Sequence, residues 1–192
     1  MKSKNAADIA DEIIHLYTLY GGEEYSGEKV SQLEHMVQAA QLARAQGFND
    51  EVVLAAFLHD VGHIAEKHTE TNSMSNYGIK DHEAIGAAYL SDLGFSSTLT
   101  RLVASHVAAK RYLTLREPGY YEKLSEASKK TLEYQGGPMS EDEADLFEED
   151  GLFREIVQMR RWDEEAKIEH LPIPPLTVFK ELIYCHLISQ PD

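Results

Sequence analysis

Six residues of types that commonly bind metal ions occur along the chain in the order His, His-Asp, His, His, Asp. They are His35, His59, Asp60, His82, His106 and Asp163. His59 and Asp60 are adjacent in the apolar segment LAAFLHDVGH, where a charged carboxylate costs several kcal/mol unless it is paired or binds a metal. A lone His-Asp pair is more often a hydrogen-bonded core histidine beside an aspartate. Because the six residues fall on five different predicted helices, the whole set favours a metal centre.

The elements that must position these residues are predicted to be helices. Apolar residues recur at helical spacing, and capping or stop residues separate the repeats. The predicted helices cover 5–20, 31–46, 51–67, 81–93, 97–109, 121–133, 140–150, 151–168 and 175–189. The polar residues 68–79 are predicted to form a loop. We expect an all-α protein with one domain over residues 1–192 and a loop at about 21–30, because a helical bundle can direct several side chains to one centre.

The composition limits the classes of partner. The 192 residues carry a formal net charge of -15 without a basic stripe, which argues against nucleic acid and anionic membrane surfaces. No apolar run approaches the roughly 20 residues of a membrane span. The polar N-terminus does not resemble a signal peptide, so we expect a cytoplasmic protein. The one cysteine, Cys185, cannot form an internal disulfide.

The order of the six residues resembles that of the HD superfamily. Members with four ligands are mononuclear phosphohydrolases, and the two additional histidines of this chain resemble those of the dinuclear branch. The resemblance implies a single HD-domain helical bundle. It implies that one metal ion is bound by His35, His59, Asp60 and Asp163. His82 and His106 would bind the second ion, with Asp60 as the bridge.

The ligand types leave the chemistry of the metal centre open. One carboxylate has two oxygens and can bridge two cations about 3.5–4 Å apart. Imidazole together with carboxylate suits iron, manganese or zinc. The dinuclear HD proteins include phosphodiesterases as well as oxygenases. Residues outside the ligand set must therefore separate hydrolysis from oxidation.

Five segments resemble a narrower group, the HD oxygenases that degrade phosphonates. They are EEYSGEKVSQLEHMVQAAQLA, HDVGH, SHVAAKRYL, LSEASKKTLEYQGGPMS and RRWDEEAKI. The resemblance covers essentially the whole chain in order. It implies two iron ions in a mixed-valent Fe(II)/Fe(III) state, with O2 as co-substrate. The implied reaction is a dioxygenase cleavage of the carbon–phosphorus bond of a small organophosphonate, (R)-2-amino-1-hydroxyethylphosphonate, to glycine and phosphate.

The resemblance also implies residues that act on the substrate. Tyr25 would be a displaceable iron ligand, and Glu28 would bind the ammonium group of the substrate together with Tyr25. His63 lies one helical turn after His59 and resembles a histidine that contacts the substrate. The predicted catalytic residues are Tyr25, Glu28, His63 and Lys110.

A phosphonate group needs cationic and hydroxyl partners. Lys110 and Arg160 each lie one helical turn from a predicted metal ligand, so each can share its pocket. Arg160 could bind two phosphonate oxygens at once, and Arg161 is the competing candidate. The resemblance adds Ser128 as a hydroxyl donor.

Several alternatives stay open from the sequence. The substrate could carry a trimethylammonium group, as 1-hydroxy-2-(trimethylammonio)ethylphosphonate does, or could be hydroxymethylphosphonate. A dinuclear HD phosphohydrolase would use the same six ligands without O2. A regulatory HD module without activity is a third possibility, although this chain retains every ligand. The sequence leaves open whether the protein is a monomer or a dimer.

Overall fold

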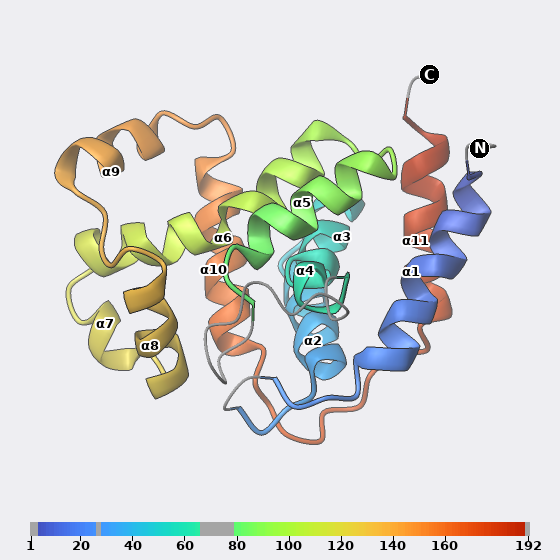
Figure 1. Cartoon of the computed structure of the whole chain (residues 1–192), viewed down its shortest axis with the longest axis horizontal. Helices are drawn as coiled ribbons and strands as arrows, with labels where there is room; N and C mark the ends of the chain where they lie inside the picture. Colours follow the sequence, from blue (N-terminus) through green and yellow to red (C-terminus); the bar gives the residue numbers. More distant parts are fainter. Residues whose placement is uncertain (1–3, 26–27, 66–78, 191–192) are drawn as a thin grey trace.

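The protein is helical throughout the part of the chain that this computed structural model describes, residues 4–25, 28–65 and 79–190 (Figure 1). These residues contain no strand, and an isolated β-bridge joins Glu24 and Ser31. The helices are α1 (Ala6–Tyr20), α2 (Gln32–Ala45), α3 (Asp50–Leu58), α4 (Val61–Ala65), α5 (His82–Asp92), α6 (Ser97–Arg116), α7 (Tyr120–Lys123), α8 (Glu126–Tyr134), α9 (Glu141–Glu148), α10 (Phe153–Glu165) and α11 (Thr177–Ile188). The all-α fold class is confirmed.

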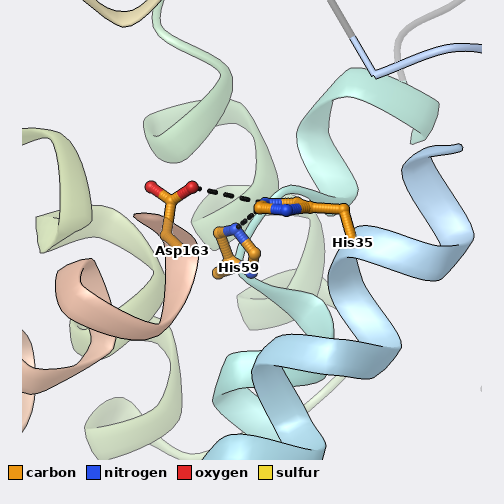
Figure 2. A group of neighbouring side chains, drawn as sticks. All are labelled: His35, His59 and Asp163. Carbon is orange, nitrogen blue, oxygen red and sulfur yellow. Dashed lines mark hydrogen bonds and ion pairs between the residues drawn. The ribbon is translucent and has the colours of Figure 1, made fainter. Parts of the chain in front are cut away.

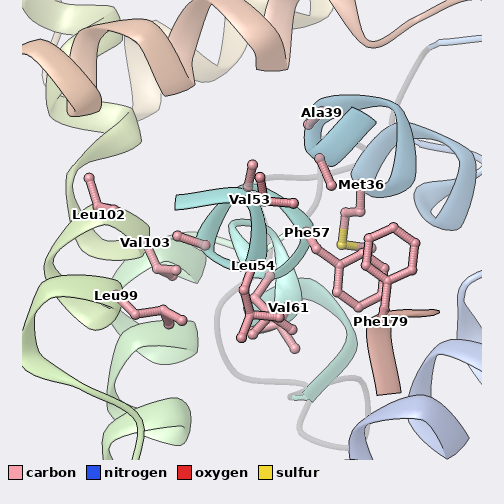
Figure 3. Packing of buried hydrophobic residues seen from close by; sticks show 14 of the residues in the cluster. Met36, Ala39, Val53, Leu54, Phe57, Val61, Leu99, Leu102, Val103 and Phe179 are labelled. Carbon is pink, nitrogen blue, oxygen red and sulfur yellow. The ribbon is translucent and has the colours of Figure 1, made fainter. Parts of the chain in front are cut away.

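Helix α3 forms the centre of the hydrophobic core. Every residue from Val52 to Leu58 is buried, as expected for a short helix that is apolar on all sides. Figure 3 shows α3 between α6 on one side and α2 with α11 on the other. The rings of Phe57 and Phe179 stack with centroids 4.0 Å apart. The core therefore fixes the C-terminal end of α3, where His59 and Asp60 follow.

The predicted helix over 51–67 is interrupted at His59 and Asp60, which is a correction to the sequence analysis. α3 ends at Leu58 and α4 begins at Val61. His59 Nδ1 donates a hydrogen bond to the carbonyl oxygen of Ala56 at 2.8 Å. A side chain that binds a nearby carbonyl competes with the helical backbone bond. The interruption lies at the adjacent pair of predicted ligands.

Glycine is required where α4 crosses α5. A Cβ atom on Gly62 would lie 2.0 Å from the carbonyl oxygen of His82, which no real Cβ contact approaches. Gly86 faces the same contact from α5, since a Cβ there would lie 3.0 Å from the Gly62 nitrogen. The two glycines bring the backbones of α4 and α5 together, so that His82 comes close to the His59-Asp60 pair.

The helices after residue 97 also differ from the predicted boundaries. α6 continues to Arg116 rather than ending near 109, because Leu113 packs in a second hydrophobic cluster with Tyr120, Leu124 and Leu132. The helix predicted at 121–133 is two helices, α7 and α8, with Ser125 as the N-cap of α8. Of the loop predicted at 68–79, only Ile79 lies within the described residues.

The helices are arranged around one centre, with two short helices beside it. α2, the α3–α4 junction, α5, α6 and α10 surround the centre, and α7 and α8 lie to one side of it (Figure 1). α1 and α11 lie side by side at the opposite end of the molecule (Figure 1). None of the described helices combines the length and apolar character that crossing a bilayer demands.

Candidate metal centre and substrate cavity

Backbone carbonyl groups orient all four of the histidines predicted as metal ligands. The Nδ1 atoms lie within hydrogen-bond distance of Ala166 O (3.0 Å from His35), Ala56 O (2.8 Å from His59), Ile79 O (3.1 Å from His82) and Val103 O (2.8 Å from His106). A carbonyl oxygen can only accept, so Nδ1 carries the proton in each ring. Each Nε2 atom is then available to bind a cation, which is the usual arrangement of metal-binding histidines.

The four Nε2 atoms converge in two pairs. His35 Nε2 lies 3.2 Å from His59 Nε2, and His82 Nε2 lies 3.0 Å from His106 Nε2. If all four rings were neutral, lone pairs would face each other across both contacts. A proton or a metal ion at each position removes this repulsion. The pairing therefore indicates two separate positions for positive charge.

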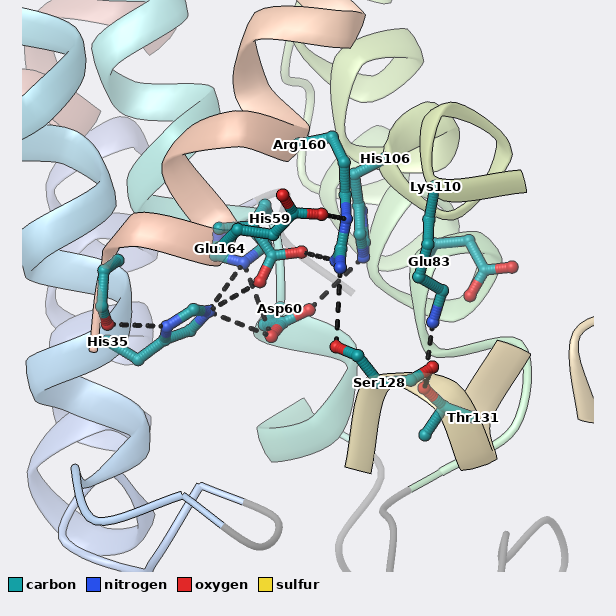
Figure 4. A network of polar contacts seen from close by, with 12 residues as sticks. His35, His59, Asp60, Glu83, His106, Lys110, Ser128, Thr131, Arg160 and Glu164 are labelled. Carbon is teal, nitrogen blue, oxygen red and sulfur yellow. Dashed lines mark hydrogen bonds and ion pairs between the residues drawn. The ribbon is translucent and has the colours of Figure 1, made fainter. Parts of the chain in front are cut away.

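Asp60 lies between the two histidine pairs, and Figure 4 shows it with His35, His59 and His106. Its Oδ2 atom is 3.4 Å from His59 Nε2 and 3.7 Å from His35 Nε2. Its Oδ1 atom is 3.2 Å from His82 Nε2 and 3.4 Å from His106 Nε2. Oδ2 is buried and has no hydrogen-bond partner within the described residues. Each carboxylate oxygen thus faces one histidine pair, as a bridging ligand would.

Asp163 completes the first group of ligand atoms. Its Oδ1 atom is 3.3 Å from His35 Nε2, and Figure 2 shows His35, His59 and Asp163 directed toward one another. Ligand atoms of these three residues all lie within 4.8 Å of one another. The group that we expected from the sequence therefore comes together from α2, α10 and the residue after α3.

The electrostatics of the centre favour cations. Burial alone would raise the pKa of Asp60, but the charge of His59 and hydrogen bonds from the surrounding histidines hold the pKa of this carboxyl well below its ordinary value. Burial would likewise lower the pKa of His59, yet the Asp60 carboxylate raises it to about 9. The residues present therefore fit two metal ions, with imidazole and carboxylate donors that suit iron, manganese or zinc.

His63 differs from the four ligand histidines. Ligand atoms of His63, Asp60 and His82 also lie within 4.8 Å of one another, which would permit a metal. However, His63 Nδ1 accepts a hydrogen bond from the Ile79 N–H at 3.2 Å, so its proton lies on Nε2 when the ring is neutral. Burial, with the nearby His82, holds the pKa of His63 well below its ordinary value. This arrangement suits His63 to donate a hydrogen bond from Nε2 rather than to bind a metal.

A cavity of about 50 Å³ adjoins the metal centre, which is room for a few water molecules or one small substrate. Most predicted site residues line it, whereas His35 and His59 are fully buried behind it. The lining residues from the sequence analysis are Tyr25, Glu28, Asp60, His63, His82, His106, Lys110, Ser128, Arg160 and Asp163. The structure thus brings all twelve predicted residues to one place.

Lys110 is a buried cation on the wall of this cavity. The residue is 3% exposed, and Nζ donates to Thr131 Oγ1 at 2.8 Å. Burial, followed by repulsion from Arg160, lowers the pKa of Lys110 to about 7. An anion in the cavity would be attracted to this ammonium and would favour its protonated form.

Arg160 lies within a network of polar side chains and, like Lys110, reaches toward α8 (Figure 4). Its Nε–H donates to Glu164 Oε1 at 3.0 Å and to the Tyr120 hydroxyl at 3.1 Å. One terminal nitrogen, Nη1, pairs with Asp163, and Nη2 lies 3.5 Å from Ser128 Oγ. The bidentate contact of Arg160 with a phosphonate stays a prediction. Of its two terminal nitrogens, Nη2 is the one that faces Ser128 on α8. The competing candidate, Arg161, pairs with Glu117 at 2.7 Å.

Tyr25 and Glu28 approach the centre from the segment between α1 and α2. The Tyr25 hydroxyl is 3.5 Å from Asp163 Oδ1, and burial together with the Asp163 and Asp60 carboxylates raises the pKa of this phenol well above its ordinary value. A bound cation would act in the opposite direction. The Glu28 carboxylate pairs with Lys167, whose Nζ is 2.6 Å from Oε1.

Several cavity residues were missed in the sequence analysis. Thr131 lines the cavity from α8, Gln135 from the C-cap of that helix, and Lys167 from the segment after α10. Thr131 lies three residues after Ser128 and Lys167 four residues after Asp163, so helical spacing from a predicted site residue could have found both. The residue type gave no separate signal, because threonine, glutamine and lysine are common on helix surfaces.

Comparison with known proteins identifies the family. Residues 32–152 match the HD domain. The chain belongs to the HD-domain family. The matched range holds five of the six predicted ligands, while Asp163 follows it.

Three relatives cover most of the HD-domain chain. It is 42% identical over 175 residues to an uncharacterized protein of Acanthamoeba polyphaga mimivirus, across 91% of this chain and 80% of that one. It is 37% identical over 179 residues to a [1-hydroxy-2-(trimethylamino)ethyl]phosphonate dioxygenase (glycine-betaine-forming) of Leisingera caerulea, across 93% and 90%. It is 39% identical over 158 residues to a hydroxymethylphosphonate dioxygenase of Gimesia maris, across 81% and 77%.

Proposed function

We propose that the protein is a di-iron dioxygenase that cleaves the carbon–phosphorus bond of a 1-hydroxyphosphonate. One observation supports the proposal: a buried lysine, an arginine and the hydroxyl groups of Ser128 and Thr131 line the same small cavity as the candidate metal ligands. These side chains are suited to the three oxygens of a phosphonate. Two relatives, at 37% and 39% identity, are named as dioxygenases of hydroxyphosphonates, which supports the reaction class.

The reaction balances with O2 alone. A 1-hydroxyphosphonate and one O2 contain every atom of the carboxylic acid and phosphate that result. Oxidation of C1 to the carboxylate level releases four electrons, which reduce one O2 completely. No further reductant is needed. Two iron ions, in a mixed-valent Fe(II)/Fe(III) state, would supply O2 activation and bind the hydroxyl and phosphonate oxygens of the substrate.

The residues of the chain would bind and orient the substrate. Lys110 and Arg160 would neutralise the phosphonate, with Ser128 and Thr131 as hydroxyl partners. His63 would donate its Nε2 proton to a substrate oxygen, since Nδ1 is engaged by the Ile79 N–H. The Tyr25 hydroxyl, beside Asp163, would hold a metal position until the substrate displaces it.

The substrate that we propose first is (R)-2-amino-1-hydroxyethylphosphonate, with glycine and phosphate as products. Its ammonium group would lie at Glu28, at the end of the cavity formed by the segment before α2. The same reaction on the trimethylammonium analogue is the alternative, since that group occurs in the name of one relative. A dinuclear phosphohydrolase is the other alternative. The small cavity disfavours nucleotides as its substrates.

The test is phosphate release by the iron-loaded protein with and without O2. We expect one phosphate and one glycine for each O2 consumed from the aminoethyl substrate. Asp60→Asn, which removes a charge that faces both histidine pairs, serves as the inactive control. Phosphate release that proceeds equally well without O2, or hydrolysis of simple phosphoesters, would contradict the oxygenase and leave the phosphohydrolase.

A further inference from the structure

The carboxylate predicted to bind the substrate's amine already has a cationic partner. Lys167 Nζ lies 2.6 Å from Glu28 Oε1, a short contact of the kind that charge-assisted hydrogen bonds make. The two side chains are only 19% and 17% exposed, so water screens the pair less than it would on the surface. Both residues line the cavity beside the metal centre. The negative charge at this end of the cavity is therefore largely neutralised.

The Tyr25 ring, at the same end of the cavity, also has partners on the protein. Tyr25 stacks on His35 with ring centroids 3.9 Å apart and an angle of 17° between the planes. Lys167 Nζ lies 5.9 Å from the centre of the Tyr25 ring, within the range of cation–π attraction. At this end of the cavity, one lysine thus contacts two groups that attract cations, the Glu28 carboxylate and the Tyr25 ring.

Primary and quaternary ammonium groups would respond differently to this arrangement. A primary ammonium has three N–H donors and can hydrogen-bond to a carboxylate that also accepts from Lys167. A quaternary ammonium has no N–H, and it is recognised by aromatic faces and by uncompensated negative charge. Lys167 takes up both of these features and adds a positive charge of its own. The quaternary group, which is also the bulkier of the two, gains little at this end of the cavity.

We propose that Lys167 determines specificity by disfavouring substrates with a quaternary ammonium group. This inference rests on the proposed function, because it concerns the substituent of a 1-hydroxyphosphonate. The preferred substrates then carry a primary ammonium group or no substituent at all. Removal of the Lys167 charge would release the Glu28 carboxylate and the Tyr25 ring, and would admit the trimethylammonium analogue.

The experiment compares three ligands by calorimetry with the iron-loaded protein in the absence of O2. They are 2-amino-1-hydroxyethylphosphonate, its trimethylammonium analogue and hydroxymethylphosphonate, which lacks the substituent. For the wild type we expect a Kd for the trimethylammonium compound at least tenfold above that for the amino compound. Lys167→Met should reduce this ratio at least fivefold, mainly through tighter binding of the trimethylammonium compound. Lys167→Arg, which keeps the charge, should preserve the ratio.

A double variant separates specificity from simple packing. In Glu28→Gln combined with Lys167→Met, most of the gain for the trimethylammonium compound should be lost, because the released carboxylate is gone and only the released Tyr25 ring remains. The proposal is overturned if Lys167→Met changes all three Kd values by the same factor, or if the wild type binds the trimethylammonium compound as tightly as the amino compound. Melting temperature and iron content of each variant verify that the fold and the metal centre persist.

The same compounds distinguish failure of the proposed function from failure of the Lys167 proposal. O2-dependent phosphate release is measured with the same three compounds. If they bind but release no phosphate, the reaction is wrong, and the ratio of Kd values still tests Lys167. If none of the three binds to the wild type, both proposals are contradicted.

Discussion

Lys110 should lower the stability of the fold while it serves the substrate, and Lys110→Met tests this directly. Methionine has a similar length and fills irregular space without a charge. The pKa of Lys110 falls from 10.5 to about 7 on folding, first through burial and then through Arg160. At about 1.4 kcal/mol per pKa unit, the protonated lysine costs the folded state about 4–5 kcal/mol at pH 6. The variant should therefore be more stable than the wild type, with a higher Tm.

The pH dependence gives this prediction its sign. Below pH 7 the lysine is protonated in both states, so the folded protein bears the full cost. Between pH 7 and 10.5 the unfolded chain binds more protons than the folded one, and the stability of the wild type rises with pH. The advantage of Lys110→Met should therefore shrink by roughly 2–3 kcal/mol between pH 6 and pH 9.

Urea unfolding of the metal-free wild type and variant at both pH values measures this difference. The histidines titrate in both proteins, so their contribution largely cancels in the comparison. Lys129→Met is the matched control on α8, because Glu126 raises the pKa of Lys129 and its removal should bring no gain. A Lys110→Met protein that is less stable at pH 6, or whose advantage is independent of pH, would refute the reasoning. Phosphonate binding should be lost in this variant in either case.

Three further results are expected. Asp60→Asn should lose both iron ions, whereas Asp163→Asn should mainly lose the ion at the His35 side. Plasma mass spectrometry measures the iron content, and equal amounts of iron in the two variants would contradict this prediction. Glu164→Gln should raise KM for the phosphonate about tenfold with less effect on kcat, because Glu164 helps to hold Arg160; Arg161→Gln is the control, and equal effects of both would rule out the positioning role. Chelation of the metal should lower the Tm of the wild type far more than that of Asp60→Asn, as scanning calorimetry would show.

The helical scaffold was largely predictable because its signals are local. Ser31 and Ser140 form capping boxes with glutamates three residues later, and such pairs are visible in a sequence. The grouping of the six candidate ligands was predictable because metal-binding residue types in an apolar context are costly without a metal, and their binding of metal stays a prediction. Their gathering in two histidine pairs around Asp60 agrees with the expected order. The single domain, the cytoplasmic location and the oligomeric state stay predictions.

The features that sequence analysis missed depend on contacts between distant segments. Glu28 and Lys167 are 139 residues apart, so neither position indicates that the expected amine partner is already paired. The break between α3 and α4 depends on the hydrogen bond that the Ala56 carbonyl accepts from His59. The apolar pattern over 51–67 continues across this break and so does not indicate it. The extension of α6 to Arg116 depends on packing of Leu113 against Tyr120. Helical periodicity carries no information about such contacts.

The four carbonyl groups that orient the ligand histidines belong to the main chain, at Ala56, Ile79, Val103 and Ala166. A substitution can delete a side-chain partner, but it leaves a backbone carbonyl in place. The orientation of these histidines therefore depends on the path of the backbone rather than on the identity of neighbouring side chains. The residues around the centre, and the cavity with them, could therefore change without loss of the carbonyl groups that orient these histidines. Such robustness would allow one scaffold to diversify its substrates over evolution.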